Sequence, residues 1–443
     1  MQTSFTLAQL ADPDIAEADK ILRACVHCGF CTATCPTYVL LGDELDSPRG
    51  RIYLIKDMLE NDRPATADVA THIDRCLSCL SCMTTCPSGV HYMHLVDHAR
   101  AHIEETYRRP FLDRAIRAMI ARALPDPTLF RWSLLAAFFA KPLAPLFERI
   151  GLKPLAAMLR LAPTAFPPRP RGGPRVFRAQ GERRGRVALL TGCAQSVLTP
   201  QINEAAIRVL TRHGIEVVLA EGETCCGSLV HHMGRKEEAL AFARADIDAW
   251  IREIDGEGID SILVTASGCG TTIKDYGYML RGDPRYAEKA RKISALARDV
   301  SEYVNKINNL KVESQSRLTV AYHAACSLQH GQKIVREPKE ALSKSGFVVK
   351  DVPDGHLCCG SAGTYNLLQP QLATALRDRK VASIAKVAPD VIAAGNVGCI
   401  TQIAAGTDVP VVHPIELIDW ATGGPVPGAL RGQRVRSDRA VGP

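Results

Sequence analysis

The spacing of the 16 cysteines constrains this chain of 443 residues more than any other feature. Eight of them form two runs of the pattern Cys-x2-Cys-x2-Cys-x3-Cys-Pro, and the second run repeats the first 51 residues later. The runs are Cys25, Cys28, Cys31 and Cys35, followed by Pro36, and Cys76, Cys79, Cys82 and Cys86, followed by Pro87. If the two runs bind metal together, the fold must bring two loops that are distant in the sequence close to each other.

This pattern is typical of ferredoxin domains with two [4Fe–4S] clusters, in which the cysteine before proline ligates the other cluster. The spacing therefore predicts two ligand sets, namely Cys25, Cys28, Cys31 and Cys86 for cluster 1, and Cys76, Cys79, Cys82 and Cys35 for cluster 2. Zinc is the alternative, but zinc sites commonly use two separated Cys-x2-Cys pairs, which two identical four-cysteine runs match poorly. Residues 51–60, between the runs, have helical apolar spacing, and the module resembles the α-helical ferredoxin domain of respiratory complexes.

The other eight cysteines form a second internal repeat. In each half a single cysteine precedes the second cysteine of a Cys-Cys-Gly sequence by 33 residues, and another single cysteine closes the half. The two sets are Cys193, Cys225, Cys226 and Cys269, and Cys326, Cys358, Cys359 and Cys399. Repeats at this distance predict two homologous lobes.

Each lobe cysteine follows a short β-like run, such as 187–191 before Cys193 and 318–323 before Cys326, and helical segments separate the runs. Ligand sites in α/β sheets lie at the carboxyl ends of strands, so the cysteines of each lobe are expected to gather there. The predicted fold class is α+β multidomain, with an α-helical two-cluster ferredoxin module followed by two tandem α/β lobes. The predicted domains are the ferredoxin module at 1–110, a helical connecting segment at 111–162, a Pro/Arg-rich linker at 163–186, lobe 1 at 187–310, lobe 2 at 311–422 and a disordered tail at 423–443.

The two lobes, residues 187–421, resemble the cysteine-rich CCG domain of heterodisulfide reductases and of several respiratory dehydrogenase subunits. The fullest form of that motif ends in Cys-x2-Cys, whereas each lobe here ends in a single cysteine, Cys269 or Cys399. The shorter set argues against two clusters of the heterodisulfide reductase type. A further iron–sulfur centre, a zinc site, a redox-active cysteine pair and a site without metal all stay open for the eight lobe cysteines. The neighbouring histidines are His231, His232, His323 and His356, and such histidines more often make ordinary hydrogen bonds than bind metal.

Composition and end segments limit the other classes of function. The first 20 residues lack the features of a secretion signal, which predicts a cytoplasmic protein whose thiols stay reduced. No stretch is long enough to span a bilayer, and the apolar run 132–140 suits at most a peripheral contact with the inner face of the membrane. The net charge of +7 comes mainly from basic segments that we interpret as solvated, so no nucleic-acid partner is expected. No dinucleotide fingerprint is present, so neither FAD nor NAD is expected on this chain.

Longer stretches narrow the resemblance to one family. ILRACVHCGFCTATCPTY, LGDELDSPRGRIYLIK, TCPSGVHY, TASGCG and HLCCGSAGTYN closely resemble the iron–sulfur subunit of glycolate oxidase (glycolate dehydrogenase), over about residues 21–420. The resemblance implies a multi-subunit complex in which an FAD-binding subunit oxidises glycolate to glyoxylate, beside a second flavoprotein-type subunit. This chain would relay the electrons toward a quinone-type acceptor. No catalytic residue carries over to it, only the cluster ligands from Cys25 to Cys86.

Two alternatives share the same cysteine motifs. One is the iron–sulfur subunit of a lactate dehydrogenase or of an anaerobic glycerol-3-phosphate dehydrogenase, which would have the same clusters and a different substrate. The other is a thiol–disulfide enzyme of the heterodisulfide reductase type, with its chemistry at the lobe cysteines.

Overall fold

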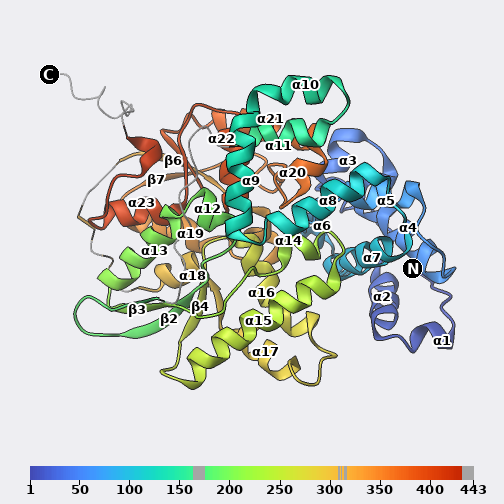
Figure 1. Ribbon diagram of the computed structural model, residues 1–443, viewed down its shortest axis with the longest axis horizontal. Coiled ribbons are helices and arrows are strands. Elements are labelled where there is room, and N and C mark those ends of the chain that lie inside the picture. The colour runs from blue at the N-terminus through green and yellow to red at the C-terminus, as the bar shows by residue number, and fades with distance from the viewer. Residues whose placement is uncertain (163–174, 308–309, 311, 314–316, 432–443) are drawn as a thin grey trace.

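The computed structural model describes residues 1–162, 175–307, 310, 312–313 and 317–431. Figure 1 shows a helical module (blue) at the right, with lobe 1 (green to yellow) and lobe 2 (orange to red) filling the centre and left. The predicted fold class is confirmed, since a ferredoxin-type helical module precedes two α/β lobes that each contain a mainly parallel sheet.

The helical module is built from short helices whose starts are specified by local sequence. Asp12, Ser47 and Thr66 each accept a backbone N–H bond at a helix start, and proline occupies the first position of the helices that follow Asp12 and Ser47. The apolar stretch expected at 51–60 lies within α4, which buries Ile52 and Ile55 in the core of the module. The helices are α1 (Leu7–Leu10), α2 (Pro13–Ala24), α3 (Pro36–Leu41), α4 (Pro48–Glu60), α5 (Ala67–Asp74), α6 (Ser81–Thr85) and α7 (Tyr92–Thr106), with the 3-10 turn η1 (Glu44–Asp46).

Four further helices connect the module to the lobes. They are α8 (Phe111–Ala123), α9 (Pro127–Ala140), α10 (Ala144–Arg149) and α11 (Lys153–Leu161), with the turn η2 (Lys141–Leu143). α8 buries Ile116 and Ile120 against Val230 of lobe 1, and α9 buries Phe130 and Leu134 against Val197. These contacts hold the connecting helices across the lobes, as Figure 1 shows for α9.

Lobe 1 has a five-stranded sheet in the order β1-β3-β2-β4-β5. All its pairings are parallel except that of β1 with β3, and Val187 of β2 lies opposite Val217 of β3. Helices cover both faces, which explains why Val187, Ala188 and Leu189 are all fully buried. The elements are β1 (Arg175–Phe177), β2 (Gly185–Leu189), α12 (Ala194–Leu198), α13 (Gln201–Arg212), β3 (Ile215–Leu219), α14 (Ser228–His231), α15 (Lys236–Asp255), β4 (Ser261–Val264), α16 (Ser267–Met279), α17 (Ala287–Leu296), β5 (Ala297–Asp299) and α18 (Val300–Asn305).

Lobe 2 repeats this plan with a four-stranded parallel sheet in the order β7-β6-β8-β9. Its central strand β8 is buried along its whole length, which matches the continuous apolar sequence of that strand. The elements are β6 (Thr319–His323), η3 (Ser327–Gly331), α19 (Glu337–Lys344), β7 (Val348–Asp351), α20 (Tyr365–Leu368), α21 (Pro370–Ala385), β8 (Val391–Ala394), α22 (Val397–Ala404), β9 (Val411–Val412), α23 (Pro414–Ala421) and η4 (Gly428–Leu430).

Two segments differ from the sequence-based expectation. Of the predicted linker 163–186, residues 163–174 lie outside the described residues, and the remainder contains β1 and the start of β2. β1 covers the edge of β3, whose backbone groups would otherwise have no strand partner on that side. Of the predicted tail 423–443, residues 432–443 lie outside the described residues, whereas η4 buries Leu430 against the core of lobe 2. Burial of this leucine removes apolar surface from water and so stabilises the position of η4 on lobe 2.

The helical module is attached to lobe 1 by ion pairs. Asp14 pairs with both Lys236 and Arg281 at 2.5 Å, and Nε2 of His94 lies 2.9 Å from Asp275. The contact with lobe 2 includes a 2.8 Å hydrogen bond between the Thr84 hydroxyl and Nδ1 of His330. Among the described residues, no helix is long and apolar enough to cross a membrane.

Candidate metal centres

The four cysteines predicted for cluster 1 line one small cavity of the helical module. Cys25, Cys28 and Cys31 lie in the loop after α2, and Cys86 follows α6, so the two distant loops meet as the crossover pattern requires. Positive φ angles at His27 and Gly29 turn the first loop back on itself. Cys28 is exposed, whereas Cys25 is buried, so the cavity lies close to the protein surface. Four of the five thiols that line this cavity belong to the predicted cluster 1 set, and the fifth is that of Cys82, which the spacing assigns to cluster 2.

The four cysteines predicted for cluster 2, Cys35, Cys76, Cys79 and Cys82, are all buried. Several donors reach their sulfur atoms, and the fully buried Arg51 is the most notable of these. Its guanidinium lies 3.8 Å from Sγ of Cys35. The hydroxyl of Tyr92 lies 3.8 Å from Sγ of Cys76. Hydrogen bonds and positive charge at the sulfurs stabilise the reduced form of an iron–sulfur cluster, so this environment suits a redox centre.

The lobe cysteines lie just beyond the carboxyl ends of strands, where the sequence placed them. Cys193, Cys226 and Cys269 follow β2, β3 and β4, and Cys326, Cys359 and Cys399 follow β6, β7 and β8. The cysteines of a lobe lie in contact as a chain, beginning in lobe 2 with Sγ of Cys326 at 3.8 Å from Sγ of Cys358. The same succession runs from Cys193 to Cys269 in lobe 1.

The backbone conformation and the close packing at the third position of each Cys-Cys-Gly sequence require glycine. Gly227 and Gly360 have φ angles of +79° and +88°, which favour glycine. An added Cβ would lie 2.9 Å from the carbonyl oxygen of Ala239 at Gly227, and 2.5 Å from that of Ala373 at Gly360. Glycine therefore lets the loop bring its two cysteines against the following helix.

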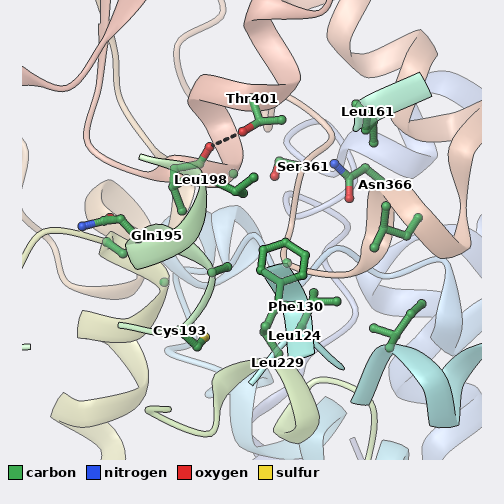
Figure 2. A pocket seen from close by; sticks show the side chains of 18 of the residues that line it. Leu124, Phe130, Leu161, Cys193, Gln195, Leu198, Leu229, Ser361, Asn366 and Thr401 are labelled. Atoms are coloured by element: carbon green, nitrogen blue, oxygen red, sulfur yellow. Dashed lines mark hydrogen bonds between the residues drawn. The ribbon is translucent and has the colours of Figure 1, made fainter. Parts of the chain in front are cut away.

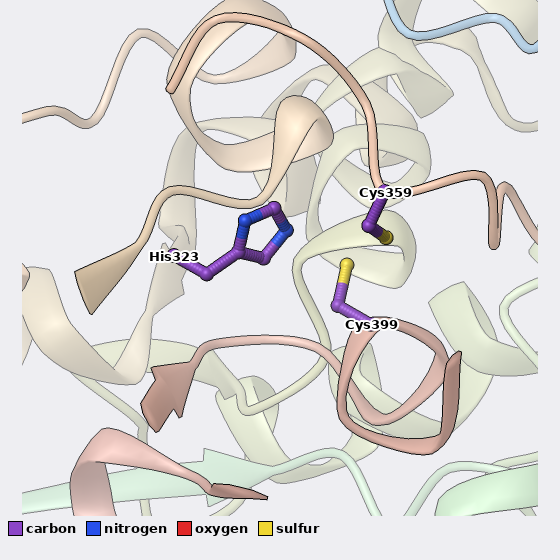
Figure 3. A group of neighbouring side chains, drawn as sticks. All are labelled: His323, Cys359 and Cys399. Carbon is purple, nitrogen blue, oxygen red and sulfur yellow. The ribbon is translucent and has the colours of Figure 1, made fainter. Parts of the chain in front are cut away.

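Of the four histidines noted in the sequence, only His323 has a ring nitrogen that joins lobe cysteines in a compact donor group within the described residues. Its ring and the sulfur atoms of Cys359 and Cys399 offer three donor atoms within 4.8 Å of one another (Figure 3). His231 instead pairs with Asp97 of the helical module at 3.3 Å, and His232 lies 3.8 Å from the same carboxylate. These two histidines therefore contribute to docking of the module.

A cavity of about 500 Å³ lies between the lobes and the connecting helices. Its walls carry cysteines of both lobes, namely Cys193, Cys226 and Cys269, and Cys326, Cys358 and Cys399. α9 contributes Phe130 and Leu134, and Figure 2 shows the Phe130 ring between Cys193 and the polar pair Ser361 and Asn366. The sequence does not reveal this cavity, because the apolar residues of α8, α9 and α11 have the same helical periodicity as ordinary core residues.

The second cluster site adjoins the cysteines of lobe 2. Leu77 and Cys79 of the helical module share one buried cluster with Cys358 and Tyr365. Burial raises the pKa of the Cys79 thiol, and the nearby thiol of Cys326 raises it further. The predicted metal sites of the module and the cysteines of lobe 2 therefore form a continuous series.

The two lobes bury different ionisable side chains beside their cysteines. In lobe 1, Asp246 is fully buried, accepts hydrogen bonds from Thr224 and Tyr276, and has its pKa raised by burial to about 8. In lobe 2, Lys380 is 2% exposed and donates to the carbonyl oxygen of Asp354 at 2.8 Å. Burial lowers the pKa of Lys380, and the thiols of Cys359 and Cys358 oppose that shift. The lobe 2 site is thus the more favourable one for thiolates.

Comparisons with known proteins agree with this arrangement. The family described as "4Fe-4S dicluster domain" matches residues 21–90, and the "Cysteine-rich domain" matches 187–274 and 320–404. The chain is 44% identical to the glycolate oxidase iron-sulfur subunit of Escherichia coli K12, over 95% of this chain and 99% of that protein. It is 28% identical to the probable glycolate oxidase iron-sulfur subunit of Bacillus subtilis, over 91% and 94%. The crystal structure of a hypothetical protein from Helicobacter pylori shares the fold, with a TM-score of 0.52, 10% identity and coverage of 94% and 73%.

Proposed function

Because the chain belongs to the family of glycolate oxidase iron–sulfur subunits, we propose that it is the electron-transfer subunit of a complex that oxidises glycolate to glyoxylate. In this proposal a separate FAD-binding subunit oxidises glycolate, and a second flavoprotein-type subunit accompanies it. The observation that carries the proposal is the series of cysteine sites from the surface at Cys28 through Cys79 to the lobe 2 cysteines. A series of closely spaced redox centres is what an electron relay needs.

The ligand sets predicted from the spacing are part of the proposal. Cys25, Cys28, Cys31 and Cys86 would hold one [4Fe–4S] cluster, and Cys76, Cys79, Cys82 and Cys35 would hold the other. Such clusters supply one-electron transfer when bound. The chain itself positions the two sites, keeps the inner one dry and surrounds its sulfurs with Arg51 and Tyr92. The exposed Cys28 makes the cluster 1 site the natural contact for the flavoprotein partner.

The cavity between the lobes supports a lipophilic acceptor of quinone type. It has a suitable volume for a small-molecule site and a mainly apolar wall with a few polar groups, including Gln195 and Asn366. Oxidation of glycolate to glyoxylate releases two electrons and two protons, and reduction of a quinone to a quinol consumes the same number, so the overall reaction balances. The cavity borders the lobe cysteines, and an acceptor in it would be within reach of the relay.

The exposed apolar residues of the connecting helices support a cytoplasmic location on the inner face of the membrane. Trp132, Leu146 and Ile150 are 61%, 54% and 60% exposed and lie on α9, α10 and the residue that follows it, near the helices that line the cavity. Such a surface can rest at the lipid interface, where a quinone is available. Recovery of the whole complex in the membrane-free fraction of a low-salt lysate would contradict this location.

The function is tested on the complex purified anaerobically with its partner subunits. Low-temperature EPR spectra are recorded after addition of glycolate, lactate or glycerol 3-phosphate, with dithionite as the chemical reductant. We expect reduced-cluster signals with glycolate and with dithionite, and none with the other two substrates. Signals that appear with lactate or glycerol 3-phosphate in place of glycolate would favour the alternative dehydrogenases.

A further inference from the structure

We propose that His232 delivers the protons that an acceptor takes up when it is reduced in the cavity between the lobes, with Asp97 and His231 behind it as the proton supply. Asp97 lies on α7 of the helical module, and the two histidines lie at the end of α14 and directly after it. This proposal rests on the proposed function, in which a quinone-type acceptor is reduced in that cavity.

The wall of the cavity offers few groups that can exchange a proton. Apart from the cysteines, which belong to the proposed relay, His232 is the only described lining residue with an ordinary pKa near neutral pH. The other polar lining residues carry hydroxyl or amide groups, which stay neutral, and they include Gln195, Ser361 and Asn366. Reduction of a quinone to a quinol takes up two protons with two electrons, so an acceptor in this cavity needs a proton donor beside it.

Asp97 lies directly behind His232. Its side chain is 8% exposed, and its Oδ1 lies 3.8 Å from Nδ1 of His232. Both of these atoms are buried and have no hydrogen-bond partner within the described residues. Burying a carboxylate oxygen and an imidazole nitrogen without hydrogen bonds costs free energy, and a proton shared between them would remove that cost. A small movement of either side chain would close the gap and let a proton pass.

His231 holds the proton that this path would use. Its Nε2 lies 3.3 Å from the other carboxylate oxygen of Asp97. Burial opposes protonation of His231, but the charge of Asp97 outweighs it, so the pKa of His231 is raised. Burial lowers the pKa of His232, and Asp97 offsets this only in part. The histidine behind the carboxylate is therefore the stronger base, and the histidine at the cavity is the stronger acid.

Two further charged groups face this cluster. Arg100 lies 3.6 Å from Asp97, and its charge lowers the pKa of both histidines. Asp275 of α16 raises the pKa of His231 and lies 2.9 Å from Nε2 of His94. The side chain of Asp275 is 18% exposed, so the cluster continues to groups that reach solvent. Protons used in the cavity can thus be replaced from outside the protein.

The imidazole of His232 is suited to pass a proton without turning. It can receive a proton at Nδ1 from the side of Asp97 and release another from its second ring nitrogen. Negative charge that develops on the acceptor draws this proton, and His231 then passes its own proton through the carboxylate to His232. Two such transfers, one to each quinone oxygen, balance the two electrons that the relay supplies, and solvent returns the two protons to His231.

The test starts from the complex reduced with dithionite and freed of the excess, so it does not depend on glycolate. Formation of quinol from a short-chain benzoquinone is followed by stopped flow between about pH 6 and about pH 9. We expect quinol formation in His232→Gln to be slower by at least about tenfold, since a positioned proton donor usually contributes more than this. The wild-type rate should fall as pH rises, because His231 loses its proton, and the rate in His232→Gln should vary little. The control His102→Gln, on α7 and outside the cavity, should behave as the wild type.

Two further measurements separate proton delivery from a structural role. The ratio of the rates in ordinary and heavy water should increase in His232→Gln, because proton delivery becomes the slow step. In His232→Ala, added imidazole should restore quinol formation, while an unchanged iron content and an unchanged EPR spectrum after dithionite show that the variant is folded.

The outcomes distinguish this proposal from the proposed function. Equal rates in the wild type and His232→Gln, or a loss that neither imidazole nor heavy water affects, would overturn the role of His232 alone. Absence of quinol formation in the wild type would overturn both that role and the quinone-type acceptor. Failure of glycolate to reduce the clusters would count against the proposed substrate and not against His232.

Discussion

Lobe 1 and lobe 2 hold their cysteines at the same places in the same fold, but they bury different groups beside them. Lobe 1 has Leu190 and Asp246, and lobe 2 has His323 and Lys380. The fold fixes where the backbone turns and where each thiol lies, through the strand ends and the glycines at 227 and 360. The chemistry of the thiols is set by the side chains around them, and these differ between the two halves.

The lobes also differ in how they meet the helical module. Lobe 2 meets the module at its cysteines, since Cys79 packs beside Cys358. Lobe 1 meets it through ion pairs, which include those of Asp14 with Lys236 and Arg281 and that of the buried Asp97 with His231. One lobe is thus placed to exchange electrons with the module, and the other is placed to hold it.

The largest expected effect is a difference in quinone-reduction rate between serine variants of matched cysteines in the two lobes. Cys358→Ser should reduce glycolate-dependent quinone reduction by at least about tenfold, because it alters the lobe 2 site next to Cys79. Cys225→Ser, at the matching position of lobe 1, should have a much smaller effect. The measurement is the rate of quinone reduction by the purified complex, with reduction of the flavin by glycolate as the step that both variants should retain. Equal losses in the two variants would remove the distinction between the lobes.

Asp246 gives the next effect, on the pH dependence of stability. Its folded-state pKa is raised by burial to about 8, from an ordinary value of 3.8. Between these values the unfolded chain releases the proton and the folded chain keeps it, so stability falls as pH rises from about 4 to about 8. Asp246→Asn removes the ionisation and should raise Tm at pH 8, with little change at pH 5.

The control for this prediction is Asp255→Asn, which replaces an exposed aspartate at the end of the same helix. Thermal unfolding of both variants and the wild type is followed at pH 5 and pH 8. A gain in Tm that is equal at the two pH values would show that Asp246 acts through packing and not through its charge.

The smallest expected effect concerns the attachment of the module to lobe 2. Thr84→Val keeps the shape of the side chain and removes the hydrogen bond to His330, together with the local bond that the hydroxyl donates to the carbonyl oxygen of Ser81. We expect a loss of about 1 kcal/mol, the usual contribution of one partly buried hydrogen bond. Hydrogen exchange at η3 should become faster, while exchange in lobe 1 stays the same. Faster exchange across both lobes would show that the module stabilises them as one unit.

Much of the fold could be predicted because the cysteine spacing encodes long-range contacts. The crossover of Cys35 and Cys86 follows from a local motif, and the strand ends follow from short apolar runs before each lobe cysteine. His323 was among the residues noted, but the sequence could not separate it from His231, which proved to pair with Asp97.

Other features depend on contacts that no local pattern records. The burial of Lys380 and Asp246 results from packing between elements far apart in the chain. Strand β1 lies in a segment rich in proline and arginine that has little intrinsic preference for a strand. Its pairing with β3 determines its conformation instead. The cavity between the lobes is lined by residues of three connecting helices and by cysteines of both lobes, so it forms only when all of these are packed together.

The exposure of Cys28 has a consequence for the lifetime of the protein in air. Oxidants arrive from the solvent, and a sulfur at the surface meets them before the buried sulfurs of Cys76 and Cys79 do. Damage should therefore begin at the outer corner of the module and spare the inner site.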